Sequence, residues 1–319
     1  MTETLPIIDV SALVAGKPGA AEAVAREVGK AAREIGFFYV AGHGIPALTI
    51  DHVFDTARRF FALPLEKKQE VAFALSKHNR GFIAMKGESL DPSKPADLKE
   101  GFNIGLDLAP DDPRILAGEP FRGLNLWPDM PGFRETMLDY FARVLALGRL
   151  LQRAVAVDVG LPEDFFEDKL DQSLSTLRML HYPPQPPAIE EGQLGAGEHT
   201  DYGCLTLLMT DDVGGLEVRK RDGTWLAAPP IPNVYVCNIG DCLMRWTNDV
   251  YVSTPHRVVN RSGRERYSIP FFLDPNPEAP VAAIPSCVSE ERPARYPPTT
   301  GAAYLRERLS RTYAPGMIA

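Results

Sequence analysis

The sequence predicts a mainly β fold with flanking helices: a distorted jelly roll (double-stranded β-helix) core packed against N-terminal helices. Three observations support this prediction. Eight short strand-like runs separated by turn signals lie between residues 176 and 273, and amphipathic helical patterns precede them. Prolines make up 29 of the 319 residues, about 9% against a usual ~5%. Because proline favours turns and strand edges, we expect many short strands and well-fixed loops.

The N-terminal half alternates helical periodicity with short strands. Residues 36–40 form an apolar run typical of a buried strand, followed by a turn at 42–46. Residues 77–130 have little periodicity, which indicates a long ordered loop region with short strands. Apolar residues recur at helical spacing in four other segments, which predicts helices at 19–35, around 53–61, at 132–157 and at 162–170.

After residue 174 the apolar period changes to that of strands. The predicted strands are 176–182, 204–210, 216–220, 224–227, 234–239, 242–246, 250–260 and 266–273. A final helix is predicted over 300–312, with Thr299 or Thr300 as its N-cap. We therefore expect four regions: an N-terminal helical and strand region at 1–130, connecting helices at 131–173, the jelly-roll core at 174–275, and a C-terminal extension with a helix at 276–319.

Composition restricts the classes of partner. The net charge of −8 opposes binding to nucleic acid or to an anionic lipid surface. No apolar run approaches the roughly 18 residues of a membrane span, and the N-terminus lacks the pattern of a secretory signal. The four cysteines show no CxxC spacing and suggest no disulfide framework. We expect a cytoplasmic protein, a monomer or weak homo-oligomer, that binds a small-molecule substrate, with no nucleic acid and no membrane as partner.

Two histidines and one aspartate are candidate metal ligands. In a strand, residues i and i+2 share a face, so His199 and Asp201 would point the same way. His256, at the start of a later predicted strand, is the best candidate for a third ligand. Two histidines and one carboxylate leave three positions open on an octahedral metal, which suits non-haem Fe(II) and oxygen activation. The structural alternative is that His199 caps a turn and His256 is an ordinary core histidine.

A candidate carboxylate-binding pair follows on the last predicted strand. Arg266 and Ser268 share a face by the same alternation, and a fixed guanidinium beside a hydroxyl can bind a carboxylate in bidentate fashion. A buried arginine without an anionic partner would be costly, and an oxo-acid cosubstrate would supply that partner.

The ordered set of motifs resembles the isopenicillin N synthase-like family of Fe(II)/2-oxoglutarate-dependent dioxygenases over nearly the whole chain. The motifs include Gly36-Phe-Phe-Tyr-Val40, His181-Tyr-Pro-Pro184, His199-Thr-Asp201, Ser253-Thr-Pro-His-Arg257 and Arg266-Tyr-Ser268. The resemblance implies that His199, Asp201 and His256 are the iron ligands, that Arg266 and Ser268 bind the distal carboxylate of 2-oxoglutarate, and that Tyr182 contacts the same cosubstrate. It further implies that the protein oxidises a small organic molecule with O2, by hydroxylation as the default outcome, and releases succinate and CO2.

Three alternatives stay open at this point. The same triad serves oxidases that need no 2-oxoglutarate, a zinc-dependent hydrolase could use it, and a degenerate jelly roll could bind ligands without turnover. For His43 and Asp241 a structural role is favoured over metal binding, and His181 should face away from Tyr182. Phe272 and Leu205 are plausible pocket wall. Segment 79–104, with Met85, Lys86, Lys99 and Phe102-Asn103, is either a cover over the site or an ordinary surface loop.

Overall fold

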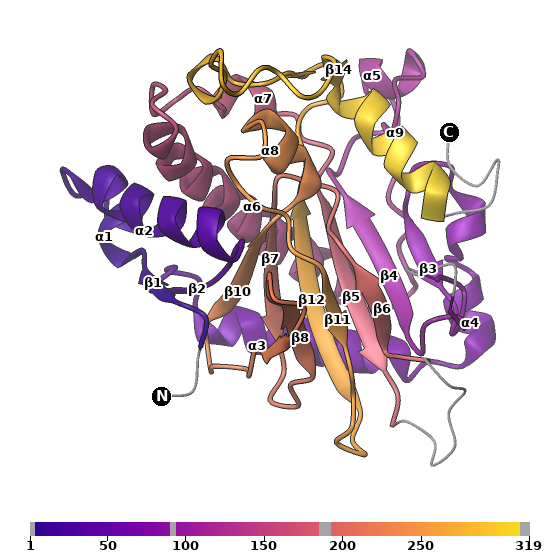
Figure 1. The fold of residues 1–319 in the computed structure, drawn as a ribbon. Helices are drawn as coiled ribbons and strands as arrows, with labels where there is room; N and C mark the ends of the chain where they lie inside the picture. The colour runs from indigo at the N-terminus through magenta and orange to yellow at the C-terminus, as the bar shows by residue number, and fades with distance from the viewer. Residues whose placement is uncertain (1–3, 90–93, 185–192, 313–319) are drawn as a thin grey trace.

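The computed structural model describes residues 4–89, 94–184 and 193–312 (Figure 1). Its helices are α1 (Ser11–Val14), α2 (Ala20–Glu34), α3 (Ala47–Phe61), α4 (Leu65–Gln69), α5 (Pro113–Leu116), α6 (Phe133–Asp158), α7 (Glu167–Leu170), α8 (Asp241–Trp246) and α9 (Gly301–Thr312). Its strands are β1 (Ile7–Asp9), β2 (Phe37–Ala41), β3 (Gly81–Ile83), β4 (Glu100–Gly105), β5 (Thr176–Tyr182), β6 (Ala196–His199), β7 (Leu205–Thr210), β8 (Leu216–Arg219), β9 (Trp225–Ala227), β10 (Tyr235–Ile239), β11 (His256–Val258), β12 (Arg266–Leu273), β13 (Pro280–Val281) and β14 (Thr299–Thr300).

Two sheets form the jelly roll that the sequence predicts. The larger has eight strands in the order β1-β2-β10-β7-β12-β5-β4-β3, and the smaller has four in the order β6-β11-β8-β9. Apolar residues from the two sheets share one cluster, among them Leu180 and Tyr182 of β5 and Val218 of β8. The inner faces of the sheets therefore pack together at this end and leave a cavity beyond it.

Helices cover the outer face of the larger sheet (Figure 1). The alternation along β12 shows how: Tyr267, Ile269, Phe271 and Leu273 join the core cluster that includes α2, α3 and α6. The intervening residues of β12 line the cavity on the other face. One strand thus supports the core with one set of side chains and the site with the other.

The join between α2 and β2 depends on a glycine. Gly36 has φ +68°, and a Cβ there would come within 2.2 Å of the carbonyl oxygen of Val252. The N–H groups of Ile35 and Gly36 both donate to the carbonyl of Ala31 and end the helix. β2 then pairs with β10 on one side and with the edge strand β1 on the other.

The structure corrects three of the predicted elements. Residues 242–246 form the helix α8 and not a strand, because Gly240 and Asp241 begin a helix whose Cys242, Leu243 and Trp246 share one buried side. Only His256–Val258 of the predicted strand 250–260 pairs as a strand, since the backbone before it bonds to the end of α2 instead. Of the predicted helix 162–170, only α7 is an α-helix, and turns precede it.

The remaining predicted helices and strands are present with ends within one or two residues of the prediction, except that α3 begins at Ala47, six residues before the predicted stretch 53–61. The backbone N–H of Ala303 donates to Oγ1 of Thr300, which confirms Thr300 as the cap of α9. β4, a six-residue buried strand, lies inside the predicted loop region 77–130. Within the part of the chain that the structure describes, no helix has the length and hydropathy needed to cross a bilayer.

Candidate metal centre and its cavity

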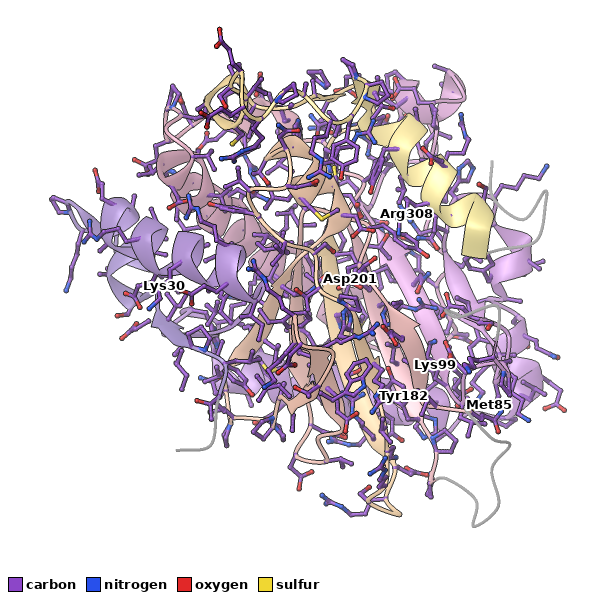
Figure 2. All side chains as sticks on the ribbon, viewed as in Figure 1. Lys30, Met85, Lys99, Tyr182, Asp201 and Arg308 are labelled. Carbon is purple, nitrogen blue, oxygen red and sulfur yellow. The ribbon has the colours of Figure 1, made fainter. Side chains whose placement is uncertain are left out.

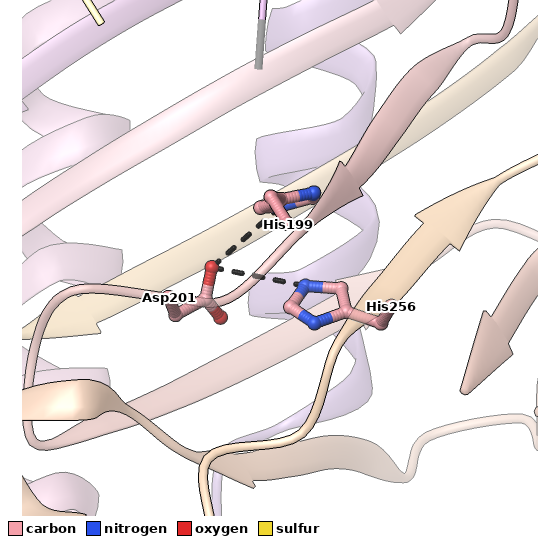
Figure 3. Close-up of side chains that lie close together, drawn as sticks. All are labelled: His199, Asp201 and His256. Carbon is pink, nitrogen blue, oxygen red and sulfur yellow. Dashed lines mark ion pairs between the residues drawn. The ribbon is translucent and has the colours of Figure 1, made fainter. Parts of the chain in front are cut away.

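The three predicted metal ligands lie together at the edge of the smaller sheet (Figure 3). β6 and β11 pair antiparallel with His256 directly opposite His199, and their ring centroids are 4.3 Å apart. β6 ends at His199, so Asp201 lies in the turn beyond it and strand alternation is not what orients it. Instead, the turn is held by α8, where the N–H of Asp241 donates to the carbonyl of Asp201.

Hydrogen bonds orient each of these side chains. Nδ1 of His199 lies 2.7 Å from the carbonyl oxygen of Gly197, and Nδ1 of His256 lies 3.2 Å from that of Thr254. A carbonyl only accepts, so each Nδ1 carries the proton and each Nε2 keeps a lone pair. Both Nε2 atoms point at Oδ1 of Asp201, at 3.8 and 3.7 Å.

The second carboxylate oxygen of Asp201 is already satisfied. Oδ2 accepts hydrogen bonds from Oγ1 of Thr206 at 2.6 Å and from Nδ2 of Asn238 at 2.8 Å. Two polar side chains from the larger sheet therefore hold the carboxylate of Asp201, which lies in the turn after β6. Such support of a ligating carboxylate is a usual feature of metal sites.

The electrostatics suit a divalent cation. Burial, and next the neighbouring His256, lower the pKa of His199 to about 3, so the imidazole is neutral. Burial alone would raise the pKa of Asp201, but the nearby histidines and the hydrogen bonds from Thr206 and Asn238 lower it. Two imidazole nitrogens and one carboxylate oxygen lie within 4.8 Å of one another. This donor set fits Fe(II) and leaves three positions open.

The predicted carboxylate-binding pair lies at one end of the same cavity. Arg266 is 0% exposed, its Nε donates to the carbonyl of Gly214 at 2.6 Å, and its Nη1 donates to Oγ of Ser268 at 3.2 Å. Its guanidinium lies 4.7 Å from the ring centroid of Tyr182. Among the described residues no carboxylate forms an ion pair with Arg266, so its buried charge suits an anionic ligand.

Comparison with known proteins agrees with this geometry. Residues 5–130 match a family described as non-haem dioxygenase in morphine synthesis N-terminal, and residues 173–275 match the 2OG-Fe(II) oxygenase superfamily. A 2-oxoglutarate-Fe(II) type oxidoreductase of Emericella nidulans is 39% identical over 315 residues, which is 97% of this chain and 90% of the relative. The chain belongs to the 2-oxoglutarate/Fe(II) oxygenase superfamily.

Other relatives have named substrates or bound ligands. A homoarginine-6-hydroxylase of Oryza sativa is 38% identical over 298 residues, 89% of this chain and 90% of the relative. The crystal structure of a full-length Neurospora crassa protein with alpha-KG (2-oxoglutarate) superposes with a TM-score of 0.86 at 36% identity, covering 96% of both chains. The same Neurospora protein with thymine gives a TM-score of 0.85 at 34% identity, again covering 96% of each chain. This chain is therefore an oxidoreductase that uses Fe(II), 2-oxoglutarate and O2.

In this oxygenase the cavity continues past the three ligands to a second end. In Figure 2, Tyr182, Asp201 and Arg308 follow one another from the bottom of the molecule towards the top. Strands of the larger sheet line this second end with one face, and their alternate residues belong to the core on the other face. The lining residues are Asn103 on β4, Thr176 and Arg178 on β5, and Phe272 on β12, with Asp274 just after it. Sequence reasoning missed Thr176, Arg178 and Asp274, although Asp274 has the parity of Arg266 and Ser268.

Ion pairs stabilise the wall of this end. Arg178 pairs with Glu88 at 2.9 Å, and Lys99 pairs with Glu88 at 3.2 Å and with Asp97. Oδ1 of Asp97 also accepts from the N–H of Gly197 at 2.9 Å, which connects this wall to the strand that carries His199. The negative charges of Glu88 and Asp97 are therefore balanced within the wall by the positive charges of Lys99 and Arg178.

Helix α9 (yellow in Figure 1) contributes to the lining of the second end of the cavity. Leu305 and Leu309 line the cavity, and Nη2 of Arg308 pairs with Oδ2 of Asp241 at 2.6 Å. The same oxygen of Asp241 accepts from Oγ1 of Thr200, which lies between the candidate ligands His199 and Asp201. Asp241 is thus a structural anchor between the turn and α9, which refines the turn role that the sequence favoured.

The two other histidines considered as candidates, His43 and His181, lie outside the site. His43 is structural, since its ring bonds the carbonyl of Asn233 and the N–H of Ile45. His181 faces away from the site, stacked on Tyr267 and bonded to Glu100.

Only some of the residues predicted to form the wall or the cover of the site line the cavity. Phe272 lines the cavity, whereas Leu205 is buried in the core. In segment 79–104, Lys99 and Asn103 line the cavity, but Met85, Lys86 and Phe102 do not, and residues 90–93 lie outside the described residues.

Proposed function

We propose that His199, Asp201 and His256 bind the iron, and that Arg266 and Ser268 bind the distal carboxylate of 2-oxoglutarate beside Tyr182. The observation that carries the proposal is the convergence of Nε2 of His199, Nε2 of His256 and Oδ1 of Asp201. In each of these side chains the other polar atom is used in a hydrogen bond to a neighbouring group, so the converging atom stays available to a metal. The guanidinium of Arg266 and the hydroxyl of Ser268 lie in the same cavity, at the end where Arg266 of β12 pairs with Tyr182 of β5.

The residues bind and orient, and the cofactors supply the redox chemistry. When bound, Fe(II) and 2-oxoglutarate would activate dioxygen, which is the oxidant, and oxidative decarboxylation of 2-oxoglutarate to succinate and CO2 would supply two of the four electrons that dioxygen takes up. Arg266 neutralises the distal carboxylate in a dry pocket, where its fixed fork sets the direction of the cosubstrate. Apolar side chains of both sheets, such as Leu208 of the larger and Val258 of the smaller, and of α9, such as Leu305, exclude water from the reacting atoms.

We propose a small organic molecule as the primary substrate, with hydroxylation as the outcome. The cavity end beyond the ligands is enclosed by β4, β5, β12 and α9, which leaves room for a small molecule and not for a folded partner. Homoarginine and thymine, named for two of the relatives, are the first compounds to test. An oxidase without 2-oxoglutarate and a zinc-dependent hydrolase are the other candidates for the same triad.

One experiment separates these possibilities. The protein is loaded with Fe(II) and 2-oxoglutarate without oxygen, then exposed to air with single compounds while succinate is measured. A compound that stimulates succinate release above the basal rate is a substrate or a close analogue. Oxidation of a compound without loss of 2-oxoglutarate would favour the oxidase, and hydrolysis with zinc and no oxygen uptake would favour the hydrolase.

We also propose that the protein acts in the cytoplasm, as a monomer or weak homo-oligomer, without nucleic-acid partners. The four cysteines are free and buried, and the net charge is −8, both of which support this assignment. We retain the four-region division at residues 130, 173 and 275 as a working description of the chain. Sedimentation analysis tests the assembly state.

A further inference from the structure

One carboxyl group in the cavity has no partner among the described residues. Asp274 follows β12, lines the cavity and is 6% exposed, and no hydrogen bond or ion pair of the described residues reaches its side chain. Its backbone N–H is used instead, in a hydrogen bond to Oγ of Ser175. A buried polar group without a partner costs free energy, so a ligand that supplies one is favoured.

The carboxyl lies beside the turn that carries Asp201. A Cβ on Gly203, two residues after Asp201, would come within 3.0 Å of Oδ1 of Asp274. A molecule placed against the metal centre from the α9 end of the cavity therefore contacts Asp274 near its reacting atoms. Phe272, two residues earlier on the same face of β12, offers an aromatic surface next to it.

The charges of the cavity leave this carboxyl as the unbalanced one. In the wall, Glu88 and Asp97 are matched by Lys99 and Arg178. At the centre, the charges of Fe(II) and Arg266 would match those of Asp201 and a doubly charged 2-oxoglutarate. Burial, and next the negative charge of Asp201, raise the pKa of Asp274 to about 8, so a cationic partner is needed to keep this carboxyl ionised at neutral pH.

A second buried acceptor points to the same kind of ligand. Oδ1 of Asn103 has no hydrogen-bond partner, although the residue is only 1% exposed and lines the cavity. Its Nδ2 donates to Oδ1 of Asn79, whose own Nδ2 reaches Thr176, so the amide orientation leaves an oxygen free. Both unsatisfied groups can accept hydrogen bonds, so a ligand that carries hydrogen-bond donors would satisfy both.

We propose that the primary substrate is a small nitrogenous molecule whose N–H group binds Asp274, with a protonated nitrogen preferred over a neutral one. The inference rests on the proposed function and adds the chemical class of the substrate. Carboxylic acids are disfavoured at this end of the cavity, because the cations that line it, Lys99 and Arg178, are already paired with Glu88 and Asp97.

Four six-membered-ring probes of similar size test the proposal: piperidine, 2-piperidone, tetrahydropyran and cyclohexanecarboxylate. Their dissociation constants are measured with the full chain carrying Fe(II) and 2-oxoglutarate without oxygen, from the shift of the weak visible band of that complex. The shift in thermal unfolding temperature gives a second readout that needs no redox chemistry. Piperidine should bind most tightly, then 2-piperidone, with the ether and the acid about tenfold weaker or more than piperidine.

Variants assign the preference to the residue. Asp274→Asn should weaken piperidine by about ten- to hundredfold, since it removes a charge-assisted contact, and weaken 2-piperidone much less. Asp51→Asn is the matched control, because Asp51 is exposed on α3. Should Asp274→Asn fail to fold, the ranking of the four probes on the unaltered protein still decides the question.

The proposal is overturned if the acid or the ether binds as well as piperidine, if neither N–H probe binds, or if Asp274→Asn changes piperidine affinity by less than about twofold. The visible band and the basal release of succinate report on iron and 2-oxoglutarate alone. If both are present while the probes fail, only the substrate class is wrong. If both are absent, the proposed site fails, whatever the probes do.

Discussion

Two hydrogen bonds to Oδ2 of Asp201 should control the affinity of the metal centre. Thr206→Val removes the 2.6 Å bond from Oγ1 with almost no change of shape, and Asn238→Leu removes the 2.8 Å bond from Nδ2. Both donors are buried and lie on the larger sheet, whereas the two histidine ligands lie on the smaller one. Their loss leaves the carboxylate in place but less stabilised as an anion and freer to rotate.

The magnitude follows from the strength of a hydrogen bond to a charged group. Such a bond contributes about 1.5–3 kcal/mol, and 1.4 kcal/mol corresponds to about tenfold in a binding constant. Each variant should therefore weaken divalent metal binding by about ten- to hundredfold, in line with the usual effect of residues that support a metal ligand.

The acid limit of metal binding should move in the same variants. The pKa of Asp201 is lowered in the folded protein, so the carboxylate persists above it and metal binding is lost as pH falls through it. Removing a bond that favours the anion raises that pKa. Binding should then be lost at a higher pH than in the unaltered protein.

Competition with a chromophoric chelator measures the affinity, using Fe(II) without oxygen or Co²⁺ as a stable substitute, across a pH series. Thr136→Val on α6 is a matched control, because the structure gives that hydroxyl no hydrogen bond. Affinities within about twofold of the unaltered protein, together with an unshifted acid limit, would refute the role given to these two bonds.

Three further predictions follow from the site. His199→Ala, Asp201→Ala and His256→Ala should each abolish stoichiometric Fe(II) binding while circular dichroism stays unchanged; retention of stoichiometric iron in any one removes that residue from the site. Arg266→Lys should raise the half-saturating concentration of 2-oxoglutarate about ten- to hundredfold, because an ammonium cannot reproduce the planar fork, and an unchanged value would require another carboxylate partner. Arg308→Ala should loosen α9, seen as faster tryptic cleavage near the C-terminus and more succinate released without substrate; unchanged cleavage would contradict the anchoring role.

The sequence predicted the parts of the fold that have a long regular pattern. Helices α2, α3 and α6 and strands β5, β10 and β12 extend over five or more residues with a clear apolar period, so their type was decided by the pattern alone. α8 was predicted as a strand because six residues are too few to distinguish the two periods. Gly240 and Asp241 before its apolar residues were the signal for a helix start.

The metal ligands were predicted for a reason that holds only in part. His199 and His256 do lie on paired strands, but Asp201 lies beyond the strand end, and α8 positions it through the turn. The substrate end of the cavity could not be predicted, because it depends on which strands become neighbours in space. β4 and β5 pair across 71 residues of sequence or more, and no local pattern in either strand fixes that pairing.

Oxygen-dependent consumption of 2-oxoglutarate tests the central claim most directly. The unaltered protein is loaded with Fe(II) or with Zn²⁺, and the loss of 2-oxoglutarate, the uptake of O2 and the release of succinate are measured side by side. With Fe(II) all three should proceed together, and with Zn²⁺, which is redox-inert, none should. Arg266→Ala should lose the iron-dependent reaction at low 2-oxoglutarate and recover it at high concentration. Equal turnover with zinc, or succinate release without oxygen uptake, would contradict the account.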